Sequence, residues 1–241
     1  YLDTEAMRYK VVRNSDGTVV ANNLSTCEFT ETLGTETLSQ YSYTVTPYVG
    51  ELVGAAATSN SIKLGTHCLV PYIETFDSKE ALDNFTIIDG YDDGYTWAFR
   101  DGWDMAQSRY SFKNPMDEWL ITPPIYLQKG KLYKLTFTSS SKRVYPDRLE
   151  VKMGQGTAIE DMVTTLVKDT LYKTDEYIPD VVYDFDIDVK VEKDGDYHIG
   201  FHAMAEPQMS DLRLDDISLT YVSELGCPQR VTNLTATAGE K

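Results

Sequence analysis

The sequence lacks features that define several classes of protein. No apolar run approaches the roughly 20 residues needed to cross a bilayer, so we expect no membrane insertion. The first ten residues contain neither a basic n-region nor an apolar h-region, so we expect no signal peptide in this sequence. Cysteine is scarce, and none of Cys27, Cys68 and Cys227 belongs to a CxxC pair, which excludes a zinc site built from cysteines alone.

Positive charge is also scarce. The 241 residues include 22 Lys and Arg against 38 Asp and Glu, which gives a formal net charge of −16 at pH 7. Nucleic-acid backbones and anionic membrane surfaces repel such a chain, so we expect neither as a partner. The hydrophobic content of 41% is that of a folded protein, and the length allows more than one domain.

Alternating patterns predict an all-β fold. In "YDFDIDVKVE" (183–192), apolar or aromatic residues alternate with charged ones, which is typical of a strand with one buried and one wet face. Only "AIEDMVTTL" (158–166) favours a short helix. The period of two recurs at 41–45, 133–137, 149–153 and 197–203, with turn-forming sequences between these runs.

Two linker-like stretches, "SIKLGTHCLVP" and "VSELGCPQR", divide the chain. We therefore predict three segments, 1–66, 67–225 and 226–241. The middle segment has enough strands for a two-sheet sandwich.

Two sequences of the middle segment predict irregular strands. The prolines at 123–124 lack backbone donors, so the strand that carries Trp119 and Ile121 on one face must end, bulge or lie at an edge there. In "LRLDDISLTY" (212–221), the apolar residues change parity at Asp215–Asp216, which predicts a β-bulge.

The stretch "DGYDDGYTW" (89–97) concentrates acidic residues and glycines as metal loops do. An EF-hand is excluded, because with Asp89 at position 1 the loop places Tyr91 at position 3 and Arg100 at position 12, where a bidentate glutamate belongs. A calcium site completed by other segments stays open. A solvated turn, in which Asp89 or Asp93 accepts backbone N–H bonds, is the alternative.

Signals of catalysis are weak. The sequence contains no GxSxG elbow, Walker loop or GxGxxG fingerprint. His198 and His202 share the expected solvent face of one strand without the glutamate of a zincin motif, so we expect surface histidines. We predict that the chain is not an enzyme.

Binding is better supported than catalysis. The stretch "FRDGWDMAQSRYSF" (99–112) is predicted to be a loop that carries Trp103, Tyr110, Arg100 and Arg109. An exposed aromatic ring with hydrogen-bonding neighbours is a common way for a sandwich to hold a sugar, so these four residues are candidate ligand-binding residues. The alternative is that Trp103 closes the end of the sandwich.

Six segments of the middle domain follow one another in a recognisable order. They are "YIETFDS", "IIDGYDDGYTW", "DEWLITPPIYL", "YKLTFTS", "GDYHIGFHA" and "LRLDDISL". This order resembles the cleaved adhesin or choice-of-anchor J family, over nearly all of 70–222, and its most specific piece is Asp117–Leu127. The resemblance implies a jelly-roll sandwich of the kind found in the haemagglutinin–adhesin regions of gingipain-type proteases, and similar to MAM-type receptor domains.

The same resemblance implies structural calcium at the ends of the jelly roll. Its ligands would come from the first strand, the acidic loop and the late Asp-Asp pair. Tyr91 interrupts the acidic alternation that the family's loop often shows. The matching metal ligands in this sequence are Glu74, Asp77, Asp89, Asp92, Asp93, Asp215 and Asp216.

The flanking segments resemble parts of fibronectin type III domains. Segment 1–66 is similar to the back half of such a domain, with Tyr41, Tyr43 and Val45 at the spacing of its last strands, and 226–241 is similar to a first strand. Pairing of 228–241 with the incomplete first module, within or between chains, stays open because open sheet edges invite it.

The resemblance also suggests a disulfide. The first and last strands of such jelly rolls often pair antiparallel, which would bring Cys68 and Cys227 together. Two buried free thiols are the alternative, and Cys27 would be left over.

We expect a non-catalytic, calcium-stabilised adhesion module of a secreted or cell-surface bacterial protein, which binds glycan or host protein. A structural spacer and an accessory domain of a larger protease or glycosidase are the alternatives.

Overall fold

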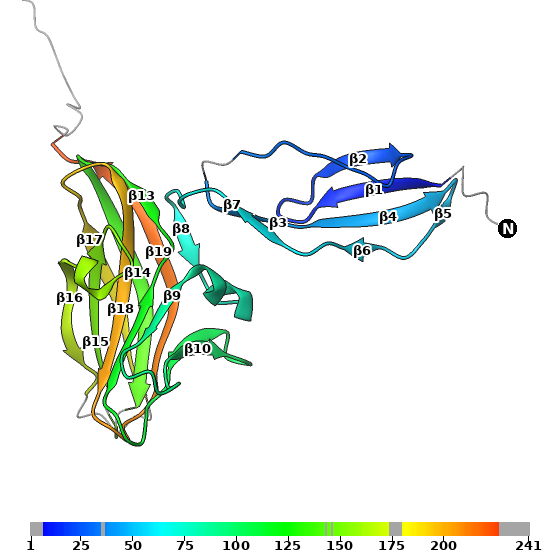
Figure 1. The fold of residues 1–241 in the computed structure, drawn as a ribbon. Coiled ribbons are helices and arrows are strands. Elements are labelled where there is room, and N and C mark those ends of the chain that lie inside the picture. Colours follow the sequence, from blue (N-terminus) through cyan, green and yellow to red (C-terminus); the bar gives the residue numbers. More distant parts are fainter. Residues whose placement is uncertain (1–6, 35–36, 143, 146, 174–179, 227–241) are drawn as a thin grey trace, which may run out of the picture. The chain divides into compact units, whose positions relative to one another are not determined.

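A computed structural model provides the coordinates, and the chain divides into two compact units, Tyr1–Cys68 and Leu69–Lys241 (Figure 1). The predicted last segment, 226–241, lies outside the described residues except for Gly226. The structure describes residues 7–34, 37–142, 144–145, 147–173 and 180–226.

The first unit is an antiparallel arrangement of short strands. Its five-stranded sheet has the order β2-β1-β4-β5, with β6 paired to β4, while β3 pairs with β7. The strands are β1 (Arg8–Arg13), β2 (Val19–Leu24), β3 (Ser39–Tyr41), β4 (Tyr43–Val49), β5 (Leu52–Val53), β6 (Ala57–Thr58) and β7 (Ile62–Leu64).

Little of the first unit is buried. Among its described residues, only one hydrophobic side chain, that of Val11, is buried, at 2% exposure. Phe29 packs edge-on against Tyr43, and Glu31 accepts hydrogen bonds from Arg13 and from the Tyr43 hydroxyl, both at 2.7 Å. The resemblance of this unit to a fibronectin type III domain stays a prediction.

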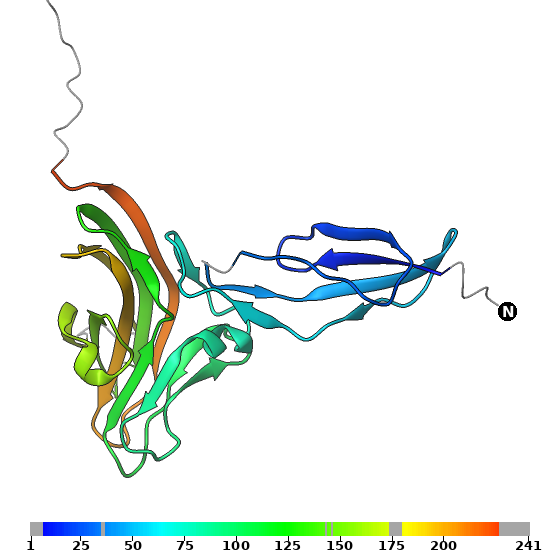
Figure 2. The same ribbon diagram turned by 45° about the horizontal axis from the view of Figure 1, so that its top comes forward.

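The second unit is a sandwich of two six-stranded sheets (Figure 1, Figure 2). One sheet has the order β10-β11-β19-β14-β17, with β8 paired to β19, and the other has the order β16-β15-β18-β12-β9, with β13 paired to β18. The predicted all-β sandwich is therefore confirmed.

The strands of this unit are β8 (Tyr72–Glu74), β9 (Thr86–Asp89), β10 (Trp97–Arg100), β11 (Met105–Ser108), β12 (Met116–Ile121), β13 (Ile125–Leu127), β14 (Lys131–Lys142), β15 (Arg148–Gly154), β16 (Thr164–Leu171), β17 (Asp180–Val189), β18 (Gly195–Ala205) and β19 (Leu212–Glu224). Two short 3-10 helices, η2 (Lys79–Asn84) and η3 (Ile159–Asp161), connect strands. No helix in the part of the chain that the structure describes is long and apolar enough to span a bilayer.

Aromatic residues from both sheets meet in the core. Phe137 of β14 stacks on Phe185 of β17 at a centroid distance of 4.4 Å and meets the edge of Phe201 of β18 at 5.1 Å. Asp184 and Asp186, which flank Phe185, are exposed. The alternation seen in the sequence thus assigns the buried face of β17 correctly.

The two predicted strand irregularities are present. β12 ends at Ile121 and β13 begins at Ile125, with the two prolines between them. In the β14–β19 ladder, Thr136 faces Ser218 but Thr138 faces Asp215, so β19 contains an extra residue. Asp216, at this bulge, has φ of 53°, in the left-handed region.

Two predictions about this unit were wrong. The stretch 99–112 is not simply a loop, because its first half belongs to the antiparallel hairpin β10–β11. His198 and His202 are not surface residues, since His198 is only 9% exposed and the His202 side chain 13%. Trp119 of β12 stacks on His202, and the backbone oxygen of Thr122 contacts His198, neither of which alternation along one strand reveals.

Candidate functional site

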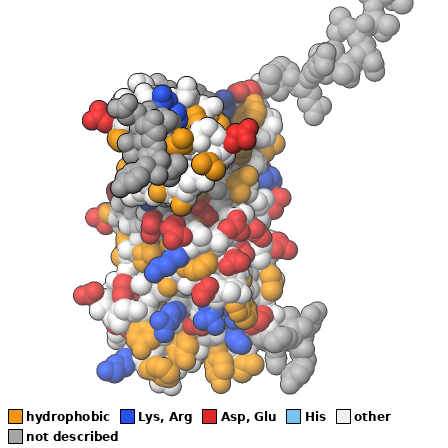
Figure 3. All heavy atoms as spheres, turned by 90° about the vertical axis from the view of Figure 1, so that its right-hand side faces the viewer, with side chains coloured by type: hydrophobic (Ala, Val, Ile, Leu, Met, Phe, Trp, Pro, Cys, Tyr) orange, Lys and Arg blue, Asp and Glu red, His pale blue; other side chains and the backbone are white. Residues whose placement is uncertain are grey.

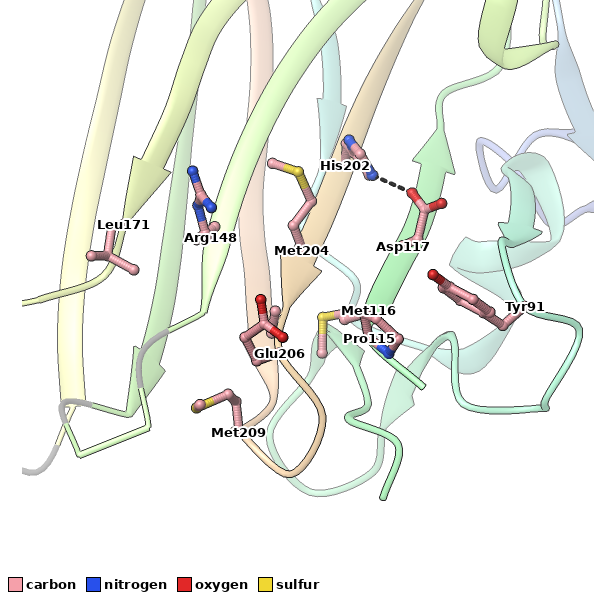
Figure 4. Close-up of a pocket in the computed structure, with 11 residues that line it drawn as sticks. Tyr91, Pro115, Met116, Asp117, Arg148, Leu171, His202, Met204, Glu206 and Met209 are labelled. Atoms are coloured by element: carbon pink, nitrogen blue, oxygen red, sulfur yellow. Dashed lines mark hydrogen bonds and ion pairs between the residues drawn. The ribbon is translucent and has the colours of Figure 1, made fainter. Parts of the chain in front are cut away.

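A groove lies on the face of the sheet β16-β15-β18-β12-β9 that is turned away from the core. The register places Asp117 of β12 opposite Met204 of β18, and Met204 opposite Arg148 of β15. Because side chains directly opposite one another share a face, these three form one row across three strands. The hollow over this row has a volume of ≈ 510 Å³ (Figure 4).

The next row, Trp119, His202 and Glu150, holds the base of the groove rigid. The His202 ring stacks on Trp119 with a centroid distance of 4.2 Å and an interplanar angle of 10°. Its Nε2 lies 2.6 Å from Oδ1 of Asp117, and its Nδ1 lies 3.6 Å from Oε2 of Glu150. Lys152 contacts the same Glu150 carboxylate at 3.0 Å.

Gly200 allows this stack to form. A Cβ at Gly200 would come within 3.1 Å of both the Trp119 ring and the Met162 sulfur. Trp119, Ile121 and Met162 form a small apolar cluster of their own. Trp119 therefore supports the groove from below, at only 2% exposure.

The rim of the groove combines aromatic, thioether and charged groups. Figure 4 shows Tyr91 on one side and Arg148 with Leu171 on the other. Tyr91 is 48% exposed, and Arg148 is oriented by Asp169, whose Oδ1 accepts a hydrogen bond from Nε at 2.7 Å. The remaining lining residues include Met116, Glu206 and Met209.

This arrangement suits binding better than nucleophilic catalysis. Both ring nitrogens of His202 face carboxylates, those of Asp117 and Glu150, rather than a serine or cysteine that it could activate. The side chains of Asp117, His202 and Arg148 can hydrogen-bond to the hydroxyl groups of a sugar. The exposed ring of Tyr91 can pack against the apolar face of a sugar ring.

The four predicted ligand-binding residues lie elsewhere: Arg100 and Trp103 belong to the hairpin β10–β11, and Arg109 and Tyr110 directly follow it. Arg100, Arg109 and Tyr110 line a second hollow of ≈ 520 Å³. Trp103 lies at the turn of the hairpin and is 53% exposed, so it does not close the end of the sandwich.

The seven predicted calcium ligands fall into two groups. The first contains Glu74 and Asp77 near the bulge residues Asp215 and Asp216, since β8 pairs with β19 there. Burial raises the pKa of Asp215, and the charges of Asp216, Asp77 and Asp104 raise it further. Burial also raises the pKa of Glu74, with a smaller contribution from Asp77.

The second group is the acidic loop, whose carboxylates accept hydrogen bonds from the loop itself. Asp89 accepts the N–H groups of Tyr91 at 3.2 Å and Gly94 at 2.8 Å. Asp93 accepts the N–H of Tyr95 at 3.0 Å. Asp92 is exposed, with φ of 53°. Among the described residues, no group of three or more His, Cys, Asp or Glu side chains gathers as a metal cluster would require.

Glu118 is a core-facing carboxylate beside this loop that the sequence did not single out. It lies opposite Asp89 in the β12–β9 ladder and is 2% exposed. Its Oε2 and the Oγ1 of Thr96 are both buried, and the Thr96 side chain is the hydrogen-bonding neighbour of this carboxylate. Burial, and to a smaller extent the charges of Asp89 and Asp93, raise the pKa of Glu118 to about 7.

The predicted disulfide is untested, because Cys227 lies outside the described residues. The pairing on which it was based is present, since β8 and β19 are antiparallel neighbours. Cys68 is partly buried, and burial raises the pKa of its thiol to about 11. Cys27 is exposed.

No protein-family model and no curated protein matches the sequence. Solved structures do match. The K1 cleaved adhesin domain of Lys-gingipain from Porphyromonas gingivalis W83 is 17% identical with a TM-score of 0.51, over 64% of this chain and 99% of that domain. The K3 cleaved adhesin domain of the same protein is 16% identical with a TM-score of 0.45, over 57% and 91%.

A xylan-binding domain, CBM22-1 of Xyn10C from Paenibacillus barcinonensis, is 10% identical with a TM-score of 0.40, over 63% of this chain and 93% of that domain. At these identities the comparisons show the fold alone. The chain contains a jelly-roll sandwich similar to that of a cleaved adhesin domain.

The groove residues were missed for an identifiable reason. Asp117, Arg148 and His202 are far apart in the sequence, and each alternates with core residues as any wet strand position does. The sequence did contain one signal. Trp119 lies two residues after Asp117 and so on the same face of β12, and a large aromatic side chain on that face is expected to be covered by other residues.

Proposed function

We propose that the chain is a non-catalytic glycan-binding module that acts outside the bacterial cell, with the groove over β12, β15 and β18 as its site. The fold supports a binding module, because it is similar to that of a cleaved adhesin domain. The observation that carries the proposal is the groove itself, in which Asp117, His202 and Arg148 are held by neighbouring groups beneath an exposed Tyr91.

The groove suits a neutral oligosaccharide. Its volume of ≈ 510 Å³ is within the range of small-molecule sites. The Tyr91 ring offers a platform for one sugar face, and the free carboxylate oxygen of Asp117 and the exposed Glu206 offer acceptors for hydroxyl groups.

A glycan array followed by calorimetric titration tests this proposal. Tyr91→Ala should weaken binding of the selected glycan by about tenfold, because it removes a contact worth roughly 1–1.5 kcal/mol. Tyr221→Ala is the matched control, since Tyr221 is also 48% exposed but lies on β19 of the other sheet. Equal loss in both variants would contradict a site at the groove.

The same screen separates the rival functions. Binding to host matrix proteins without any glycan signal would favour a protein-binding adhesin. Absence of binding to both glycans and host matrix proteins would favour a spacer or an accessory domain of a larger enzyme.

We propose calcium as a structural cofactor at the acidic loop, where Asp89, Asp93 and Glu118 would have to draw together around the ion, because they are not gathered as ligands in this structure. Calcium takes carboxylate and hydroxyl oxygens, and the buried Oε2 of Glu118 and Oγ1 of Thr96 are neighbouring oxygens of these kinds. The bound ion would compensate the negative charge of Glu118, whose burial raises its pKa.

A further inference from the structure

The hollow on the hairpin β10–β11 differs in chemistry from the groove. It is lined along β10 by Phe99 and Arg100, along and after β11 by Gln107, Arg109 and Tyr110, and by Asp211 before β19. Figure 3, turned so that the right-hand side of Figure 1 faces the viewer, shows Lys and Arg side chains next to hydrophobic ones toward its lower end.

Aromatic rings hold both guanidinium groups of the hollow. Arg100 lies over Trp103 at 5.9 Å from the ring centroid, and Arg109 lies over Tyr95 at 5.6 Å. Stacking of this kind uses the flat face of a guanidinium and leaves the N–H donors at its edge available.

Neither arginine is neutralised within the described part of the chain, where no carboxylate lies within ion-pair distance of Arg100 or Arg109. The carboxylate of Asp211 is occupied instead by Gln107, whose Nε2 donates at 2.5 Å, and by the Tyr110 N–H at 3.4 Å. By contrast Arg213, which also lies over Trp103, pairs with Asp180 at 3.4 Å.

Two unpaired guanidinium groups in one hollow are unexpected in a chain with a net charge of −16. Arginine recognises carboxylate and sulfate groups through paired N–H donors. The volume of ≈ 520 Å³ fits one or two sugar rings, and the exposed Phe112 offers an apolar contact. The overall negative charge opposes a long polyanion such as a nucleic acid.

We propose that this hollow binds an acidic sugar residue, with its carboxylate or sulfate group facing Arg100 and Arg109 and its ring against Tyr110 or Phe112. The proposal shares only the ligand class with the proposed function, because the groove is lined by none of these residues.

Calorimetric titration with three matched trisaccharides tests the proposal. The first is a hexuronic acid trimer, the second is the same trimer with its carboxyl groups methyl-esterified, and the third is a trimer of uncharged sugars that carries one sulfate ester. The acidic trimer, the sulfated trimer or both should bind at least tenfold more tightly than the ester. Equal affinity for all three, or no binding of either anionic trimer, would overturn the proposal.

Two variants locate the binding. Arg100→Gln and Arg109→Gln should each weaken binding of the anionic trimer by about tenfold, as loss of one charge-assisted contact predicts. Lys168→Gln removes the same charge from the exposed strand β16 of the other sheet and should have less than about a twofold effect. Equal effects of all three variants would show nonspecific attraction and would contradict the site.

Tyr91→Ala distinguishes the two proposals. It should leave binding of the anionic trimer unchanged while it weakens the neutral glycan selected by the array. If the neutral glycan fails to bind but the anionic trimer still depends on Arg100 and Arg109, only the groove proposal falls. If the arginine variants bind the anionic trimer as the native chain does, this inference falls alone.

Discussion

Glu118→Gln should make the second unit more stable at pH 8. Burial raises the pKa of Glu118 from 4.5 to about 7. Between these pH values the folded protein therefore keeps a proton that the unfolded chain has released. The free energy of unfolding therefore falls as the pH rises above 4.5. The loss is complete above pH 7, where it amounts to about 3 kcal/mol. Glutamine keeps the shape of the protonated side chain and removes this loss.

Urea unfolding in EDTA, followed by tryptophan fluorescence, measures the effect. All three tryptophans, Trp97, Trp103 and Trp119, lie in the second unit, so the signal reports that unit. The native protein should lose stability between pH 4.5 and 7 relative to the variant, and the variant should exceed it by about 2–3 kcal/mol at pH 8. Glu192→Gln is the control, because it removes the same charge from an exposed residue of the same unit.

The same experiment with calcium tests the cofactor. At about ten times its dissociation constant, calcium should add about 1.4 kcal/mol to the native protein and nothing to Glu118→Gln. A variant that is less stable than the native protein at pH 8 in EDTA would refute the account of Glu118. Equal stabilisation of both proteins by calcium would place the ion elsewhere.

Other substitutions test other parts of the structure. Burial also raises the pKa of the fully buried Asp147 to about 6, so the native protein should lose up to about 3 kcal/mol of stability between pH 4 and 6. Asp147→Asn should abolish this loss in urea unfolding. A pH profile that is the same in the variant and the native protein would contradict the prediction. Gly200→Ala should destabilise the second unit by about 1–3 kcal/mol and weaken glycan binding, because its Cβ displaces Trp119 beneath His202, whereas Gly34→Ala has open space and should be neutral in thermal melts. If the Gly200→Ala variant melts at the same temperature as the native protein, the Trp119–His202 stack tolerates displacement and the prediction is contradicted.

Local sequence determined much of the second unit. The alternation in 183–192 and the parity change at Asp215–Asp216 identify one buried face and one bulge correctly, because both depend on neighbours within a few residues. The tandem proline likewise marks the break between β12 and β13.

The binding surfaces could not be predicted in the same way. His202 was expected at the surface because it alternates with core residues of β18, but its burial depends on Trp119, a residue of another strand. Register between strands brings Asp117, Met204 and Arg148 together, and a single sequence does not state that register. The same limit hid Glu118: alternation along β12 does not tell which face is the core, because both faces of this strand are buried.

Methionine methyl NMR tests the central claim most directly. The chain contains seven methionines, of which Met116, Met204 and Met209 line the groove, while Met153 and Met162 are buried elsewhere in the second unit. Titration with the neutral glycan selected by the array should shift the methyl signals of the three groove methionines and leave Met153 unchanged. Saturable binding without a shift at Met116, Met204 or Met209 would contradict the groove as the glycan site.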